Sequence, residues 1–345
     1  MNRNRRKRSK TKTPGQIYRR SFFFSFSICL LTLCSLTAFF ILRGGNLLSG
    51  ETEPVQGSAE VPYPVSGSAA PSLNAKEEDC LTVLFMGVKD SDSVSNTYLL
   101  VRFDPVRGRI PVVSLPPQTM VVRPDGDPTP HPLWETYRYG GRSLAVKALS
   151  NTLGVPIDRY VVIDWKGFQQ AAEWVGPVQY ALRYALDFQD EERSIRLTQG
   201  LQLVDGQKAL DIVTYPGYAG GETTRSEITA ELAVKIIGDK LSLAASPAAE
   251  GLFKKIVNRV ETDITYKDFE TRRSAAAAMS GKDAAIQLPL DGGWPNTKEY
   301  RLSQNFLQQI QTYFGPEKPE EQGEDTSAPS DENHYDVQRS DVPWN

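Results

Sequence analysis

The sequence predicts an α/β protein: a single extracytoplasmic domain with a mostly buried central β-sheet packed by helices, preceded by one transmembrane helix. Three observations predict this organisation. Apolar, β-branched runs alternate with segments of helical period across residues 79–315. Residues 21–42 hold no charge and no proline. The segments 43–78 and 316–345 lack the hydrophobic periodicity of folded elements.

The N-terminal segments have the pattern of a membrane anchor. Residues 1–20 form a basic tail with nine Lys and Arg and no acidic residue. Residues 21–42 span about 33 Å as a helix, enough to cross a hydrocarbon core of roughly 30 Å. Because basic flanks stay in the cytoplasm, we expect a single-pass cell-membrane protein whose C-terminal domain is extracellular. A cleaved signal peptide is the alternative, but the apolar run exceeds the about 7–15 residues of a signal core and no A-x-A site follows it.

Two segments that flank the predicted domain have the composition of unstructured chain. Residues 43–78 are rich in Gly, Pro, Ser, Ala and Glu and show no helical or strand period, which indicates a flexible linker. Residues 316–345 hold nine acidic residues against Lys318 and Arg339, which indicates an acidic disordered tail.

The net charge of −3 conceals a division along the chain. The first 43 residues hold ten Lys and Arg, so the remainder carries 29 basic against 42 acidic residues. An acidic body lacks the basic face that DNA or RNA binding requires, so nucleic acid is excluded as a partner. The expected partner of the N-terminal segments is the membrane lipid bilayer.

Apolar runs and helical periodicity predict four strands and five helices in the domain. The apolar runs expected as strands are residues 81–88, 97–104, 109–115 and 159–164. The segments expected as helices are residues 143–153, 165–175, 224–243, 266–279 and 303–314. The sequence T-R-S-E from Thr224 to Glu227 has the pattern of a capping box, so the longest helix is expected to begin there.

Few side chains have the pattern of a metal or catalytic site. The chain has three Cys and two His, too few for a disulfide framework or a zinc cluster. Asp90 and Asp92 follow the first predicted strand and are the candidate metal ligands, with an ordinary surface turn as the alternative. Gly140-Gly141 and the loop 217–225 are candidate anion cradles, with a tight turn and a plain helix entry as the alternatives.

Four stretches of the chain together match a known family pattern in order and spacing. They are VLFMGV, SNTYLLVRFDP and VVSLPPQT within 83–119; TYRYGG at 136–141; GVPIDRYVVIDWKGFQQAAEWVGPV at 154–178; and GLQLVDGQKALDIVTY with GETTR within 200–225. On these motifs, residues 80–280 resemble the LytR-CpsA-Psr family of cell-envelope proteins.

The resemblance implies a fold, an activity and a set of partners. Members of the family carry one N-terminal membrane helix and an extracellular domain. They transfer glycopolymers from polyprenyl-pyrophosphate carriers onto peptidoglycan, with the lipid tail in an apolar tunnel. Arginines and Mg²⁺ neutralise the pyrophosphate, and carboxylates hold the metal. A polyprenyl-linked glycopolymer, peptidoglycan and Mg²⁺ are therefore the expected partners and cofactor.

The charged residues that the resemblance implies are mostly replaced in this sequence. Neutral residues stand where the family has aspartate or arginine: Asn96, Pro117, Gln118, Thr214, Pro216 and Ile228. Arg225 is the one retained arginine and the candidate catalytic residue. The resemblance implies that the substrate-binding residues are Asn96, Gln118, Thr119, Glu222 and Arg225. Lys89 takes the place of the family's first aspartate, beside Asp90 and Asp92.

These replacements leave three readings of function. The first is a catalytically degenerate family member that binds a cell-wall polymer or its lipid carrier, because neutral side chains cannot replace the charges. The second is an active phosphotransferase whose charges come from other positions: Arg102, Arg123, Arg138 or Arg142. The third is an unrelated extracytoplasmic α/β module.

Overall fold

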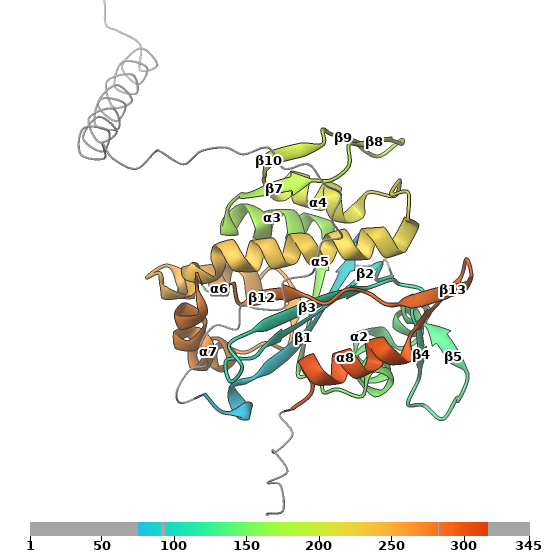
Figure 1. Cartoon of the computed structure of the whole chain (residues 1–345). Coiled ribbons are helices and arrows are strands. Elements are labelled where there is room, and N and C mark those ends of the chain that lie inside the picture. The colour runs from blue at the N-terminus through green and yellow to red at the C-terminus, as the bar shows by residue number, and fades with distance from the viewer. Residues whose placement is uncertain (1–74, 91–93, 282, 317–345) are drawn as a thin grey trace, which may run out of the picture. The chain divides into compact units, whose positions relative to one another are not determined.

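A mixed six-stranded sheet forms the centre of the domain in the computed structural model, which describes residues 75–90, 94–281 and 283–316 (Figure 1). The strand order is β11 (Glu261–Thr262), β6 (Arg159–Asp164), β1 (Leu81–Val88), β2 (Thr97–Phe103), β3 (Ile110–Leu115) and β12 (Ala285–Gln287). β2 runs antiparallel to β1 and β3, and β1 runs parallel to β6. The four predicted strands are thus confirmed as β1, β2, β3 and β6, with ends that differ by at most one residue.

Helices cover both faces of this sheet, which confirms the predicted α/β architecture. Helices α2 (Leu133–Leu153) and α8 (Gln304–Phe314) lie on one side in Figure 1, and α5 (Gly221–Lys240) lies on the other. α5 packs against β3 and β12. α7 (Tyr266–Met279) contributes Met279 to a small apolar cluster with Ile110 and Ala284.

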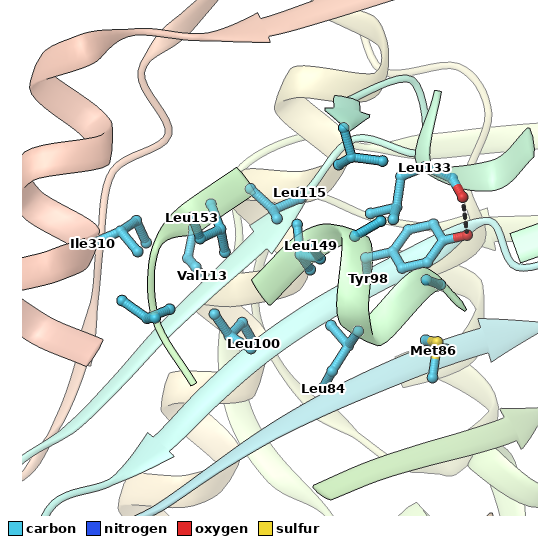
Figure 2. Packing of buried hydrophobic residues seen from close by; sticks show 14 of the residues in the cluster. Leu84, Met86, Tyr98, Leu100, Val113, Leu115, Leu133, Leu149, Leu153 and Ile310 are labelled. Atoms are coloured by element: carbon cyan, nitrogen blue, oxygen red, sulfur yellow. Dashed lines mark hydrogen bonds between the residues drawn. The ribbon is translucent and has the colours of Figure 1, made fainter. Parts of the chain in front are cut away.

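The main core lies between the sheet and helices α2 and α8 (Figure 2). Leucine, valine and aromatic side chains from β1, β2 and β3 meet those of the two helices, and most are fully buried. Figure 2 shows Leu84, Leu100, Leu149 and Leu153 packed together, with the Tyr98 hydroxyl directed at the Leu133 carbonyl. The buried side chains of these strands and helices therefore form one continuous apolar core.

A second apolar layer packs outside α5, and the sequence patterns did not predict this layer. It holds α3 (Trp165–Val175), α4 (Gly206–Thr214), the paired strands β7 (Val178–Leu182) and β10 (Gly200–Val204), and the hairpin of β8 (Leu186–Gln189) and β9 (Ser194–Leu197). Of these, only α3 was predicted, and its bounds agree. The strands and helices share a buried cluster that includes Tyr180, Ile195, Ile212 and Ile228.

The remaining elements are short and lie at the ends of the sheet. They are the 3₁₀ helices η1 (Glu77–Asp79) and η2 (Leu241–Ala245), helix α6 (Ala249–Val257), the pair β4 (Met120–Val122) and β5 (Pro130–Pro132), and the hairpin β13 (Gly292–Asn296) and β14 (Glu299–Leu302). The first of these begins inside the predicted linker: Glu77 forms an ion pair with the buried Arg102.

α2 begins ten residues earlier than predicted and is bent where the sequence has two glycines. Gly140 and Gly141 lie inside the helix with non-helical dihedral angles, and Gly141 has φ 64° and ψ −164°. L-residues other than glycine rarely adopt this conformation. The pair is therefore a bend within the helix, and the predicted helix 143–153 is its second half.

The predicted capping box at the start of α5 is wrong. The helix begins at Gly221, its N-cap is Gly220, and Thr224 lies inside the first turns. Two consecutive glycines let the chain turn earlier, since Gly221 takes a φ of +61°. The structure instead has a capping box at α7, where the Thr265 hydroxyl accepts from the Asp268 N–H and the Asp268 side chain accepts from the Thr265 N–H.

We therefore expect Thr265→Ala to lower the free energy of unfolding by about 1 kcal/mol, because a side-chain cap is lost. Thr224→Ala, which removes no cap, is the matched control and should cost clearly less. Thermal unfolding of the full chain in detergent, followed by circular dichroism, measures both. Equal losses in the two variants would contradict this assignment of the caps.

Several sequence predictions fall outside the described residues. They are the basic tail, the membrane helix at 21–42, the linker up to residue 74 and the acidic tail from residue 317. Within the residues that the structure does describe, no helix combines the length and apolar character needed to span a bilayer.

Candidate functional site

A pocket of about 410 Å³ opens where β1, β3 and β6 end and β2 begins. In open α/β sheets, ligands bind outside the carboxyl ends of strands. The loop before β2 contributes Asn96, the segment after β3 contributes Gln118, and the first turns of α5 contribute Glu222 and Arg225. Four of the five predicted substrate-binding residues therefore line one pocket.

The fifth predicted residue, Thr119, follows Gln118 in the chain but does not line this pocket. Its side chain is fully buried, and its hydroxyl donates to the Pro116 carbonyl at 2.7 Å. This bond holds the turn that carries Pro117 and Gln118 toward the pocket. Asp90 is exposed at the end of β1 and does not line the pocket, and Asp92 lies outside the described residues.

The guanidinium of Arg225 is buried and bonded in every direction. Its Nη2 donates to the Asn96 carbonyl at 2.7 Å, and its Nη1 donates to the Val213 carbonyl at 3.1 Å and to the Thr97 hydroxyl at 3.3 Å. Its Nε and Nη2 both donate to the Glu222 carboxylate. These five bonds use all five N–H donors of an arginine. Arg225 thus joins the start of α5 to the end of α4 and the start of β2.

Arg193, from the turn between β8 and β9, brings a second guanidinium to the pocket. It donates to the Thr214 hydroxyl at 2.6 Å and to the Thr214 carbonyl at 2.9 Å. It also lies over the Trp165 ring, 4.7 Å from the ring centre. No pattern in the sequence indicates Arg193, because only the tertiary packing of the β8–β9 hairpin brings it to the pocket.

Two tryptophans also line the pocket, Trp134 at the start of α2 and Trp165 at the start of α3. The Trp165 Nε1 and the Gln118 Oε1 are buried atoms without a hydrogen-bond partner. Trp165 was not predicted as a site residue, although its place directly after the predicted strand 159–164, at the carboxyl end of a strand, could have identified it. No pattern in the sequence pointed to Trp134.

The electrostatics of the pocket depend on few charged groups. Arg193 and Arg225 oppose one carboxylate, Glu222, which is already paired with Arg225. Behind the pocket, burial raises the pKa of Asp211 above its ordinary value, and the nearby Arg193 opposes that shift. Among the described lining residues, the charges of Arg225 and Glu222 cancel, so the pocket presents one net positive charge on Arg193, whose guanidinium retains N–H donors.

The residues around the pocket do not fit the magnesium ion that the resemblance implies. Mg²⁺ requires oxygen ligands, usually including one or two carboxylates. Among the lining residues that the structure describes, Glu222 is the one carboxylate, and Arg225 pairs with it. The Asn96 amide oxygen accepts from the Thr97 hydroxyl at 3.1 Å. Across residues 75–90, 94–281 and 283–316, no group of three His, Cys, Asp or Glu side chains could hold a metal.

None of the four arginines considered as relocated charges lines the pocket. Arg102 is buried and bonds Glu77 and Thr82. Arg123 bonds Asp127 beside β4. Arg142 bonds Tyr160 and Glu261, and Arg138 is exposed on α2. The guanidinium that lines the pocket beside Arg225 is that of Arg193, which was not among these four.

The model of the LytR_cpsA_psr family matches residues 48–314, more than half of the chain. The chain belongs to the LytR-CpsA-Psr family. The family assignment confirms the resemblance found in the sequence. Two curated relatives are polyisoprenyl-teichoic acid–peptidoglycan teichoic acid transferases. TagV of Bacillus subtilis is 24% identical over 223 residues, 59% of this chain and 57% of TagV. TagU of Enterococcus faecalis is 24% identical over 258 residues, 72% of this chain and 82% of TagU.

Solved structures share the LytR-CpsA-Psr fold with this chain. The crystal structure of B. subtilis TagV aligns with a TM-score of 0.59 at 22% identity, over 68% of this chain and 95% of that one. TagT bound to LIIa-WTA aligns with a TM-score of 0.55 at 18% identity, over 74% of this chain and all of that one. At these identities the likeness shows the fold alone, and the chain spans little more than half the length of TagV.

The positions at which LytR-CpsA-Psr motifs have arginine fall in two environments. Pro117, Thr214 and Pro216 line the pocket. Ile228 is buried in the apolar cluster under α5, beside Leu232. An arginine at that position would bury a charge among aliphatic side chains. The packing around Ile228 therefore requires an apolar side chain there.

Proposed function

We propose that this protein is a membrane-anchored cell-envelope protein that binds a polyprenyl-linked glycopolymer without transferring it to peptidoglycan. The observation that carries the proposal is the bonding of Arg225. The one arginine retained from the family motif donates all five N–H groups to the protein itself, so it has none left for a pyrophosphate.

The neutral residues of the pocket support the same conclusion. Phosphoryl transfer needs groups that neutralise the charge developing on the pyrophosphate. Each charge-assisted hydrogen bond contributes about 1.5–3 kcal/mol. Pro117, Thr214 and Pro216 line the pocket where the family motif has arginine, and the lining does not fit Mg²⁺. Together these losses remove most of the stabilisation that transfer requires.

The names of the relatives support the ligand class. TagV and TagU are named as transferases of polyisoprenyl-linked teichoic acid to peptidoglycan. A solved relative is TagT bound to LIIa-WTA. A pocket of about 410 Å³ is of the size that proteins use for small ligands, roughly 300–1,000 Å³. We propose that it receives the polar end of the glycopolymer carrier, since polar side chains such as Asn96, Gln118 and Arg193 line it.

One observation favours a second candidate, an active phosphotransferase with a relocated charge. Arg193 holds its guanidinium against Thr214, a position at which the family motif has arginine. Two of its five N–H donors are engaged there, so it retains donors for an anion. Arg193→Ala separates the two candidates. If the protein is an active enzyme, the wild type transfers the glycopolymer and the variant does not. If it is a binding protein, neither the wild type nor the variant transfers it.

The experiment that tests the proposed function is carrier binding to the full chain in detergent. We expect a short-chain polyprenyl-pyrophosphate to bind less than about tenfold more tightly than the matching alcohol, which is about 1.4 kcal/mol. Added Mg²⁺ should change either affinity little, because Arg225 already pairs with Glu222, the one carboxylate among the described lining residues. Strong, magnesium-dependent preference for the pyrophosphate would contradict the proposal.

A further inference from the structure

We infer that this pocket recognises an uncharged, hydroxyl-bearing sugar residue and does not select for a pyrophosphate. The inference rests on the proposed function, because it names the part of the glycopolymer that the pocket holds. It concerns a change of ligand chemistry, from an anion to a neutral glycan, in a site whose family motif is charged.

The lining of the pocket can both donate and accept hydrogen bonds. Gln118 Oε1 and Trp165 Nε1 are buried and have no partner. An amide presents both a donor and an acceptor whichever way it is turned, and an indole N–H only donates. A pyrophosphate has acceptors and no donors, so it leaves the acceptor of Gln118 unsatisfied. A sugar hydroxyl donates and accepts, so it satisfies both residues.

The two arginines of the lining are largely engaged by the protein itself. Arg225 is fully bonded, and its partner Glu222 adds a carboxylate to the lining. An anion placed beside that carboxylate is repelled by a like charge. Arg193 is the one cation of the described lining with donors to spare, and it is held against Thr214 and Trp165. One tethered guanidinium matches only part of the charge of a pyrophosphate, and its spare N–H groups can instead donate to the oxygen of a sugar hydroxyl.

Apolar side chains also line the pocket, among its polar groups. Trp134, Val94, Pro117 and Pro216 line the pocket together with Trp165. A sugar ring has an apolar face of C–H groups and a rim of hydroxyls. It therefore matches a wall of aromatic and proline rings that carries a few polar atoms. A hydrated phosphate gains nothing from such a wall.

The test is binding of the full chain in detergent to immobilised uncharged oligosaccharides, with inorganic pyrophosphate as competitor. N-acetylhexosamine oligomers represent wall glycan, and hexose oligomers represent the glycopolymer, so the two arms distinguish the source of the sugar. We expect binding in at least one arm that excess pyrophosphate does not displace. Failure in both arms, or displacement by pyrophosphate, overturns the inference.

Variants tie the binding to the pocket. Gln118→Ala should weaken binding about three- to tenfold, because a hydrogen bond is lost and no bond within the protein is broken. Trp134→Ala should weaken it about tenfold or more, and Trp134→Phe should restore most of it. Gln179→Ala, on the exposed face of β7, is the matched control and should change nothing. Unchanged binding in both pocket variants would overturn the inference.

The carrier-binding experiment keeps the two proposals apart. If the polyprenyl-pyrophosphate binds and no uncharged oligosaccharide does, the inference fails and the proposed function stands. If neither binds, both fail.

Discussion

An Asp104→Asn variant is expected to lose about 3–5 kcal/mol of unfolding free energy, the cost of removing one partner from a buried ionic group. Asp104 is fully buried at the end of β2. Its carboxylate accepts from the Arg107 guanidinium at 2.8 Å and from the Arg107 N–H at 3.0 Å. The guanidiniums of Arg102 and Arg109 lie 3.9 and 3.6 Å away. Without the carboxylate, these cations lose their common counter-charge inside the protein.

Urea unfolding of the full chain in detergent measures this loss. The matched control is Asp187→Asn, whose carboxylate pairs with Arg196 at 3.8 Å and is 76% exposed. Exposed ion pairs contribute about 0–1 kcal/mol, so the control should stay close to wild type. If the Asp104→Asn variant is as stable as this control, the ion pairs of Asp104 with the three arginines do not stabilise the end of β2.

An Arg225→Ala variant is expected to lose about 3 kcal/mol of unfolding free energy with no ligand present, because it strips donors from buried groups. Its removal leaves the Asn96 and Val213 carbonyls without the bonds that join α5 to β2 and α4. Arg225→Lys should lose most of the same stability, since an ammonium lacks the fork that reaches several partners.

The comparison separates a structural from a ligand-binding role. Arg196→Ala is the matched control, because Arg196 is 77% exposed and pairs only loosely with Asp187. Urea unfolding without ligand should place Arg225→Ala well below that control. If Arg225→Ala matched the control and altered only ligand affinity, the assignment of Arg225 as a structural link would be wrong and the earlier prediction of a catalytic role would regain support.

The sequence predicted the parts of the fold that have strong local periodicity. β1 and β6 were placed correctly because each is a continuous apolar run with polar residues beside it, and α3 because its apolar residues recur at helical spacing. β7 to β10 were missed, since each has only four or five residues and is stabilised by contacts with α4 and α5. The start of α5 was misplaced because the backbone freedom of Gly220 and Gly221 outweighed a sequence that reads as a cap.

The candidate site was predictable where ordered motifs marked it. Asn96, Gln118, Glu222 and Arg225 meet at one pocket, as the resemblance implied. Two properties required the structure. The saturation of Arg225 depends on carbonyls far from it in the chain, those of Asn96 and Val213. The approach of Arg193 to Thr214 depends on how the β8–β9 hairpin folds back, which no local pattern encodes.

The central claim is that this LytR-CpsA-Psr protein holds a glycopolymer and does not transfer it. The most direct measurement follows a labelled lipid-pyrophosphate oligosaccharide in the presence of peptidoglycan, with the full chain in detergent and B. subtilis TagV in a parallel reaction. The account predicts that the label co-purifies with this protein and that none becomes attached to peptidoglycan, with or without Mg²⁺. Attachment of the label to peptidoglycan above the protein-free background, and its loss in Arg193→Ala, would contradict the account and establish the transferase.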